Sequence, residues 1–212
     1  MKKFILSIAL VAAAATTAFA QIEGLSVGAG YQSYTLHQDY SITLPVIGTV
    51  TTKSDNAFGG FYAGASYTVL TLGPGIGITP GIYFSSASYK NADNADIQAK
   101  QSFLAVPINF SYKLDLVPGT LAIAPYAGPT FSYGLSYTGT ANNWTDTTNY
   151  YTDDYDVKRF NVALGGGLAL DIVDMIRVNV GYNYYLLNLY GGDGDGNINR
   201  NGVLNFGVSY LF

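Results

Sequence analysis

The sequence contains one histidine, His37, and a catalytic role for it would require a nucleophile nearby. A histidine acts as a general base when a serine hydroxyl lies within hydrogen-bond reach, and such a pair can hydrolyse or transfer acyl groups. Ser33 and Ser41 are the nearest serines in the chain. No spacing typical of a catalytic triad accompanies them. The pattern therefore favours a histidine in a solvated loop, and we predict no catalytic residue.

A second group of candidate residues lies in the run GGDGDGN at positions 191–197. Asp193, Asp195 and Asn197 occupy every second position, as in the first half of a calcium-binding loop. Ile198 and Leu204 then stand where an EF-hand has its glycine and its closing carboxylate. Glycine and aspartate are also typical of hairpin loops. We predict a turn without cofactor or resident metal, and weak calcium binding stays an open alternative.

The segment from Thr138 to Asp156 is rich in aromatic and acidic residues. Exposed aromatic rings between polar groups can stack on sugars or anchor a partner protein. The same rings can instead pack against neighbouring loops, and this interpretation is favoured. The residues concerned are Trp144, Tyr150, Tyr151, Tyr155, Asp153 and Asp154.

The elements that position these candidates are segments in which apolar and polar residues alternate. Side chains of a strand point to opposite faces with a period of two, so each segment is predicted to be a strand with one apolar face. There are eight such segments: 25–31, 61–69, 76–84, 104–112, 123–135, 160–170, 176–186 and 204–212. The apolar face carries aromatic residues near the strand ends, with Tyr137 among those expected to point outward.

The connectors between the segments are alternately short and long. Short turns are expected near residues 72–74, 115–119 and 173–174, and long connectors at 37–56, 90–100, 138–156 and 191–199. Outer-membrane barrels show this asymmetry, with short periplasmic turns and longer extracellular loops. The last strand, which ends on Phe212, is expected to pair with the first strand, because a sheet in lipid cannot leave an edge open.

The composition and the N-terminus agree with an exported membrane barrel. Residues 1–20 have a basic start, an apolar core and a small-residue site ending at Ala20, which predicts a cleaved signal peptide before a single domain at 21–212. Only 11% of residues are charged, against about 25% in soluble domains. Without Lys2 and Lys3 the chain has 8 basic and 14 acidic residues, a net charge of −6, which disfavours nucleic acid. There is no cysteine for disulfides.

The face opposite the apolar one decides between a soluble and a membrane barrel. A soluble barrel places Lys, Glu and Asp there, whereas this chain has small and polar residues. Such residues suit the inside of a narrow barrel. The sequence therefore predicts an all-β, eight-stranded, antiparallel, up-and-down transmembrane β-barrel. Its interior is expected to be filled largely by the inward residues Tyr34, Tyr62, Tyr83, Phe103, Tyr126 and Tyr185.

Several segments resemble the PorT-like, porin-like outer-membrane barrels common in Bacteroidetes. They are FLAVPINFSYKL, PYAGPTFSYGLSY, RFNVALGGGLALDI, VNVGYNYYLLNL and the closing GVSYLF. The resemblance covers nearly all of the mature chain except its loops, and it implies a fold more than an activity. The free Phe212 also resembles the signal by which barrel-assembly machinery recognises such proteins, so that machinery and periplasmic chaperones are expected partners.

We therefore expect a monomer of the Gram-negative outer membrane, surrounded by lipid, with a structural or surface-interaction role through four extracellular loops. An extracellular ligand or an envelope protein would bind those loops. A narrow, low-conductance channel is the first alternative, because inward glycines leave gaps beside the large rings. A lipid A-modifying enzyme is the second, because some eight-stranded outer-membrane enzymes use a rim histidine with a serine.

Overall fold

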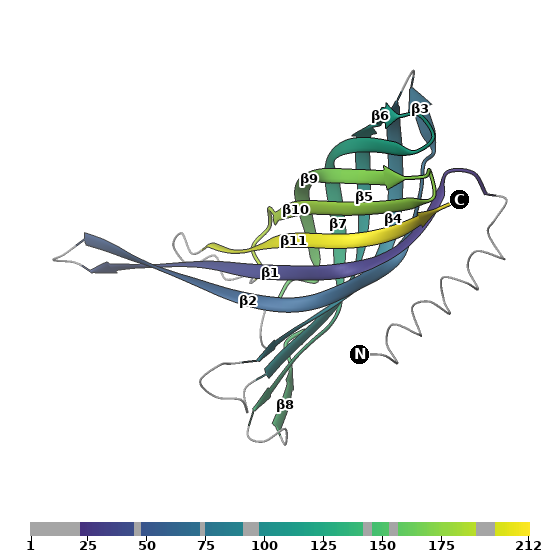
Figure 1. Cartoon of the computed structure of the whole chain (residues 1–212). Helices are drawn as coiled ribbons and strands as arrows, with labels where there is room; N and C mark the ends of the chain where they lie inside the picture. Colours follow the sequence, from purple (N-terminus) through teal and green to yellow (C-terminus); the bar gives the residue numbers. More distant parts are fainter. Residues whose placement is uncertain are drawn as a thin grey trace.

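The chain forms one antiparallel sheet that closes on itself (Figure 1). The computed structural model describes residues 22–44, 48–72, 75–90, 98–141, 146–152, 157–189 and 198–212, and the predicted signal peptide at 1–20 lies outside them. The strands are β1 Leu25–Leu44, β2 Gly48–Tyr67, β3 Leu70–Leu72, β4 Ile76–Lys90, β5 Gln98–Tyr112, β6 Leu114–Val117, β7 Leu121–Ala141, β8 Asp146–Asn149, β9 Phe160–Ile172, β10 Ile176–Tyr185 and β11 Ile198–Leu211.

Eight strands make up the ring. The other three strands are not counted separately. β3 follows β2 after two residues and pairs with β4, and β6 follows β5 after Lys113 and pairs with β7. β8 lies off the ring beside β7. The ring closes because β1 pairs with β11 and β2 pairs with β4. Tyr31 lies opposite Phe206 in the closing pair. The predicted all-β, eight-stranded antiparallel barrel is confirmed, as is the pairing of the last strand with the first.

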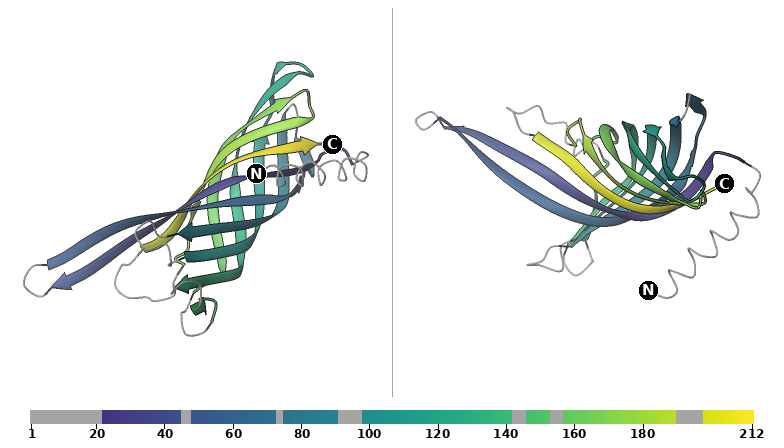
Figure 2. Two further views of the ribbon diagram at one scale, coloured as in Figure 1. Left: turned by 60° about the horizontal axis from the view of Figure 1, so that its bottom comes forward. Right: turned by 45° about the horizontal axis from the view of Figure 1, so that its top comes forward.

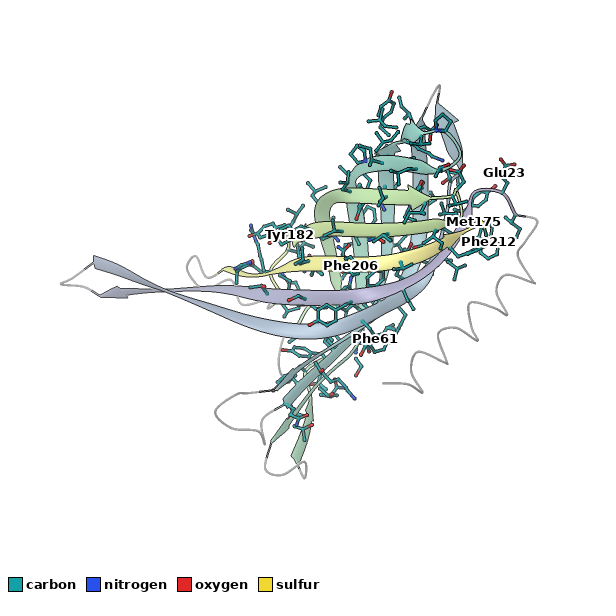
Figure 3. The ribbon with its side chains drawn as sticks, in the orientation of Figure 1. Glu23, Phe61, Met175, Tyr182, Phe206 and Phe212 are labelled. Atoms are coloured by element: carbon teal, nitrogen blue, oxygen red, sulfur yellow. The ribbon has the colours of Figure 1, made fainter. Side chains whose placement is uncertain are left out.

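The apolar face of the sheet points outward. Tyr31 and Phe206 are 57% and 56% exposed, and Figure 3 marks Phe61 and Phe206 among the side chains of this outer face. The inner face carries small and polar residues together with buried tyrosines. This distribution is the reverse of a soluble barrel, and it follows directly from the alternation of residue types along each strand.

Both ends of the described chain lie at the end of the barrel that carries the short turns. The Gly24 amide donates to the Phe212 carbonyl over 3.3 Å, and the Phe212 amide donates to the Leu25 carbonyl over 2.9 Å. The turns at this end include a left-handed glycine, Gly119 (φ +69°), and two left-handed residues with side chains, Val173 (φ +53°) and Asp174 (φ +51°). The turn predicted at 173–174 is therefore present. The turn predicted at 115–119 lies at 118–120 instead, because residues 115–117 belong to β6, and residues 73–74 of the first predicted turn lie outside the described residues.

The first long connector differs from its prediction. Residues 37–56 were expected to be a loop, but β1 and β2 stay paired through them until Leu44 meets Gly48. Alternating β-branched residues such as Ile42, Thr43 and Val50 favour strand pairing there. β1 leaves β11 after Asp39, and β2 joins β4 only at Gly59. Residues 40–44 and 48–58, here named the β1–β2 ribbon, therefore project beyond the barrel (Figures 1 and 2).

A β-bulge in β7 overturns the prediction that Tyr137 faces outward. Ser102 of β5 pairs with Ser136, while Phe103 pairs with Gly134, so Leu135 is an extra residue in β7. An extra residue shifts the alternation by one position. Leu135 is 48% exposed, and Tyr137 is only 7% exposed. The strands also extend into the three other predicted long connectors, because β5 begins at Gln98, β7 continues to Ala141 and β11 begins at Ile198.

Candidate functional site

Three aromatic side chains cross the inside of the barrel at one level. Tyr34 comes from β1, Phe103 from β5 and Tyr185 from β10, and all three belong to one buried cluster. The Tyr34 and Phe103 rings meet edge to face, with centroids 5.5 Å apart. Tyr34 is 3% exposed. This cluster, named here the aromatic plug, divides the interior into a part toward the short turns and a part toward the long loops.

The part toward the short turns contains a polar cavity of about 130 Å³. Three tyrosines, one arginine and several amides and hydroxyls surround it. The main lining residues are Tyr62, Tyr83, Tyr126, Arg177, Asn179, Asn183 and Asn205. A polar space of this size can hold several water molecules.

Tyrosines fill much of the interior because glycines face them. The Tyr62 hydroxyl accepts a hydrogen bond from the Asn179 amide over 3.3 Å, and its ring meets the Tyr83 ring with centroids 5.8 Å apart. The same hydroxyl lies so close to Gly207 that a Cβ atom there would collide with it. Only glycine at 207 therefore leaves room for Tyr62 to reach across from β2.

One ion pair lies inside the barrel near the short turns. Asp171 of β9 and Arg177 of β10 are register partners. The Arg177 Nε donates to Asp171 Oδ1 over 2.6 Å, and the second nitrogen donates to Oδ2 over 2.8 Å. Asp171 is 1% exposed. The two-point geometry satisfies both carboxylate oxygens, as a charge buried among polar walls requires.

The part toward the long loops is closed by residues of the β7–β9 connection. The Arg159 guanidinium lies 4.5 Å from the centroid of the Tyr151 ring and donates to the carbonyls of Gly134 and Tyr151 over 3.3 and 3.1 Å. Gln101 donates to the Tyr151 hydroxyl over 3.4 Å. Burial raises the pKa of the Tyr151 phenol, against the opposite effects of Gln101 and Arg159. Only about 20 Å³ remains in the pocket here.

The aromatic residues predicted between Thr138 and Asp156 therefore pack against the barrel where the structure describes them. Tyr150 and Tyr151 both contact the Tyr137 ring, with centroids 4.7 and 6.0 Å away. This supports the packing interpretation for those two residues. Trp144, Tyr155, Asp153 and Asp154 lie outside the described residues, as do Asp193, Asp195 and Asn197 of the predicted turn.

His37 lies in β1 rather than in a loop. Its ring centroid is 6.5 Å from that of Tyr184, on the outer face of the barrel. Ser33 is four residues earlier on the same strand, which places it about 13 Å away and out of hydrogen-bond reach. The Ser41 side chain is not among those described. Within the described ranges, no group of three or more His, Asp or Glu residues could hold a metal ion, and no helix is long and apolar enough to cross a membrane.

The inward direction of the aromatic residues was predicted correctly, but their grouping was not. Tyr34, Phe103 and Tyr185 are buried, and Tyr62, Tyr83 and Tyr126 line the polar cavity. Alternation shows which face a residue occupies, whereas the level at which it lies depends on strand register. The contacts between Arg159 and Tyr151 had no signal in the sequence, because they join a loop to the inside of the barrel.

The sequence matches the family model described as outer membrane protein beta-barrel domain over residues 6–212. The chain is similar to the crystal structure of Ail, the attachment invasion locus protein of Yersinia pestis, at 13% identity and a TM-score of 0.48, covering 90% of this chain and 99% of Ail. It is also similar to Neisserial surface protein A, at 14% identity and a TM-score of 0.46, covering 90% and 98%.

A third similar structure is that of the outer membrane enzyme PagL, at 12% identity and a TM-score of 0.44. That match covers 84% of this chain and 97% of PagL. No curated protein matches the sequence.

Proposed function

This chain belongs to the outer membrane protein β-barrel family, and we propose that it acts in the outer membrane as a surface-interaction protein. In such barrels the short turns face the periplasm and the longer loops face the outside. The β1–β2 ribbon and the β7–β8 hairpin then lie on the cell surface. The barrel is a monomer that anchors the ribbon and the hairpin in the membrane. The pattern of the signal peptide supports cleavage after Ala20. The segments quoted above support a PorT-like subgroup.

The observation that carries the proposal is the β1–β2 ribbon. Beyond Asp39 and before Gly59, its two strands pair with each other and with no other described strand. Both outer edges of the ribbon therefore present unpaired backbone amides and carbonyls. Edges of this kind accept an added strand from a partner, which supplies main-chain hydrogen bonds at little structural cost. The ribbon is the part of the molecule best placed to bind an extracellular ligand or an envelope protein.

Shortening the ribbon tests this function. Residues 41–51 would be replaced by Asn-Gly, a two-residue turn that suits a hairpin and leaves the barrel register intact, because Tyr40 and Thr52 are register partners. On intact cells we expect the shortened protein to lose the partners that chemical cross-linking captures with the wild type. The control replaces residues 192–196 with Asn-Gly and should keep those partners. The same set of cross-linked proteins with both variants would contradict the proposal.

A narrow channel is the second candidate, and the polar cavity of about 130 Å³ favours it. The aromatic plug opposes it, because Tyr34, Phe103 and Tyr185 fill the level above the cavity. We expect no stable unitary current from the purified protein in planar bilayers, and a current from the triple variant in which all three are alanine. Stable unitary currents from the wild type would favour the channel.

A lipid A-modifying enzyme is the third candidate, and we propose that the protein has no such activity. The separation of His37 from Ser33 supports this proposal, because a general base needs its nucleophile within hydrogen-bond reach. Lipid A from cells expressing the His37→Ala variant should be identical to lipid A from cells expressing the wild type. A change in acylation that depends on His37 would contradict it.

Phe212 supports a role for barrel-assembly machinery and periplasmic chaperones in insertion. Its amide and carbonyl close the hydrogen bonding between the first and last strands, and its ring lies 4.8 Å from that of Tyr210. We expect Phe212→Asp to reduce membrane insertion while Leu211→Asn does so less. Equal amounts of heat-modifiable protein in the membrane for Phe212→Asp and the wild type would contradict this.

A further inference from the structure

The β1–β2 ribbon has two edges, and the edge formed by β2 is the longer one. From residue 48 to residue 58, β2 pairs with no described strand other than β1, because β4 joins it only at Gly59. The corresponding stretch of β1 is only 40–44, because β11 pairs with β1 as far as Asp39. The free stretch of β2 exceeds a typical strand of about 5–6 residues, so it can pair with a complete strand of a partner.

The sequence of this edge carries one basic and one acidic residue, Lys53 and Asp55, on either side of Ser54. In a second copy that runs in the opposite direction, the order of the two charges is reversed. Two copies that meet about Ser54 therefore place Lys53 of each copy opposite Asp55 of the other. Charged residues at a sheet edge ordinarily oppose the addition of a strand, whereas here they are complementary to the same edge of a second copy.

Backbone geometry limits the registers in which two copies of this edge can pair. Along a strand, the amide and carbonyl groups of every second residue point to the same edge. Two residues directly opposite each other in an antiparallel pair either both direct these groups at the partner or both direct them away. When a strand pairs with its own copy, the two residue numbers of each pair are therefore both odd or both even. The two-fold axis then passes through a residue.

Among the axes that this rule allows, only the axis at Ser54 places opposite charges across from each other. An axis at Lys53 would place two lysines opposite each other, and an axis at Asp55 would do the same with two aspartates. Opposite charges directly across a strand pair are stabilising, and like charges are destabilising. The Ser54 register also lies entirely within the free stretch, with Val50 opposite Phe58 at its ends.

The register inside the ribbon continues this alternation of charge. Asp39 of β1 is the register partner of Lys53, and His37 is the register partner of Asp55. In the paired ribbons, Lys53 would have an acidic register partner on each side, Asp39 of its own chain and Asp55 of the second copy. A cross-strand row of this kind favours the pairing of two copies over the pairing of the ribbon with an uncharged strand.

We propose that the partner of the β1–β2 ribbon is a second copy of this chain in a facing membrane, paired through the two β2 edges about Ser54. The two-fold axis of an antiparallel strand pair is perpendicular to the sheet. The ribbon continues the wall of the barrel (Figure 2), so this axis lies in the plane of the membrane and the second barrel points the opposite way. Many such pairs between two surfaces add their contacts. The inference rests on the proposed function, because it names the partner of the same ribbon.

The first test uses the whole protein in two populations of lipid vesicles that carry different epitope tags. The chain has no cysteine, so Ser54→Cys introduces a single thiol. In the proposed register this residue lies opposite its own copy, at a Cα separation of about 4.5–5.5 Å that a disulfide can span. We expect mild oxidation of the mixed vesicles to produce dimers that carry both tags. Thr52→Cys is the control, because its two copies would lie about 13 Å apart, and it should give at least tenfold fewer dimers.

Exchange of the two charges tests the register independently. Vesicles with Lys53→Asp and vesicles with Asp55→Lys each bring like charges together, so we expect each population alone to cluster about tenfold less than the wild type, measured by light scattering. A mixture of the two populations restores opposite charges across every pair. Its clustering should return to the wild-type level, which also shows that both variants are folded.

Equal yields of dimer from Ser54→Cys and Thr52→Cys would overturn the proposal, as would a mixture of the charge variants that clusters no more than either population alone. Dimers of Ser54→Cys that never carry both tags would place the two copies in one membrane and would overturn it as well. The proposed function fails by a different result, namely unchanged cross-linked partners after the ribbon is shortened.

Discussion

Inside the barrel, a tyrosine on one strand packs over a glycine on another strand. Tyr62 crosses from β2 toward Gly207, and the Tyr126 hydroxyl lies over Gly181 while it donates to the Val180 carbonyl over 3.4 Å. Each ring occupies space that a glycine leaves empty. A narrow barrel can be filled in this way without bulky residues on every strand.

The Tyr62 and Gly207 pair gives a prediction about stability. A methyl group at Gly207→Ala would collide with the Tyr62 hydroxyl, so we expect a loss of about 1–3 kcal/mol in the free energy of unfolding. Tyr62→Phe removes the colliding oxygen and should restore part of that loss. Urea unfolding in lipid vesicles measures all three variants. Strictly additive effects of the two substitutions would contradict the pairing.

The Asp171 and Arg177 pair gives a second prediction at this scale. Arg177→Met would leave the buried Asp171 carboxylate without its partner, and we expect this to cost about 3–5 kcal/mol. Replacing both residues, as Asp171→Leu with Arg177→Met, removes the unpaired charge and should cost less. The same urea titration compares the variants. A double variant that is less stable than Arg177→Met would show that the charge is not the cause.

At the scale of elements, the turn between β9 and β10 stores backbone strain. Val173 and Asp174 both have positive φ, and the Met175 amide donates to the Ile172 carbonyl over 3.2 Å. Two positive φ angles define a type I′ turn, which favours Asn and Gly and strongly disfavours a β-branched residue. Asp174 also accepts a 2.8 Å hydrogen bond from Lys113, which raises the pKa of Lys113.

Val173→Asn should therefore stabilise the barrel by about 1 kcal/mol, because asparagine adopts the left-handed conformation more readily than valine. Asp174 is kept, so the contact with Lys113 stays. The control is Val117→Asn, at an exposed valine in β6 that is not left-handed. The temperature at which heat modifiability is lost reports both changes. Equal shifts for the two variants would argue against backbone strain at Val173.

The sequence predicted the number of strands and the positions of the turns better than the strand ends. Alternation of residue types was enough to predict the eight strands of the ring. Neighbouring residues of a strand face lipid and the narrow interior in turn, and these two surroundings require different residue types. The β1–β2 ribbon was missed, since a polar strand such as 48–56 pairs through its backbone and shows no apolar face. The bulge at Leu135 was missed as well, because local composition does not reveal an extra residue.

The site was predicted only in part for a related reason. The inward direction of Tyr34, Phe103 and Tyr185 follows from alternation, but their meeting depends on the register of strands far apart in the sequence.

At the scale of the whole molecule, an apolar outer wall surrounds a closed interior, and a ribbon projects from one end. The ring has no open edge at the level of the wall, as a barrel in lipid requires. The first and last described residues and the short turns gather at the opposite end. This arrangement separates anchoring, which belongs to the barrel, from interaction, which we assign to the ribbon.

The central claim is that the ribbon is displayed on the cell surface while the short turns face the periplasm. The chain has no cysteine, so single cysteines report position cleanly. Intact cells would be treated with a polymer-linked maleimide too large to cross the outer membrane. We expect Thr49→Cys in the ribbon to be labelled and Asp115→Cys in β6, at the short-turn end of the barrel, to be labelled only after the membrane is opened. Labelling of Asp115→Cys but not Thr49→Cys on intact cells would contradict the account.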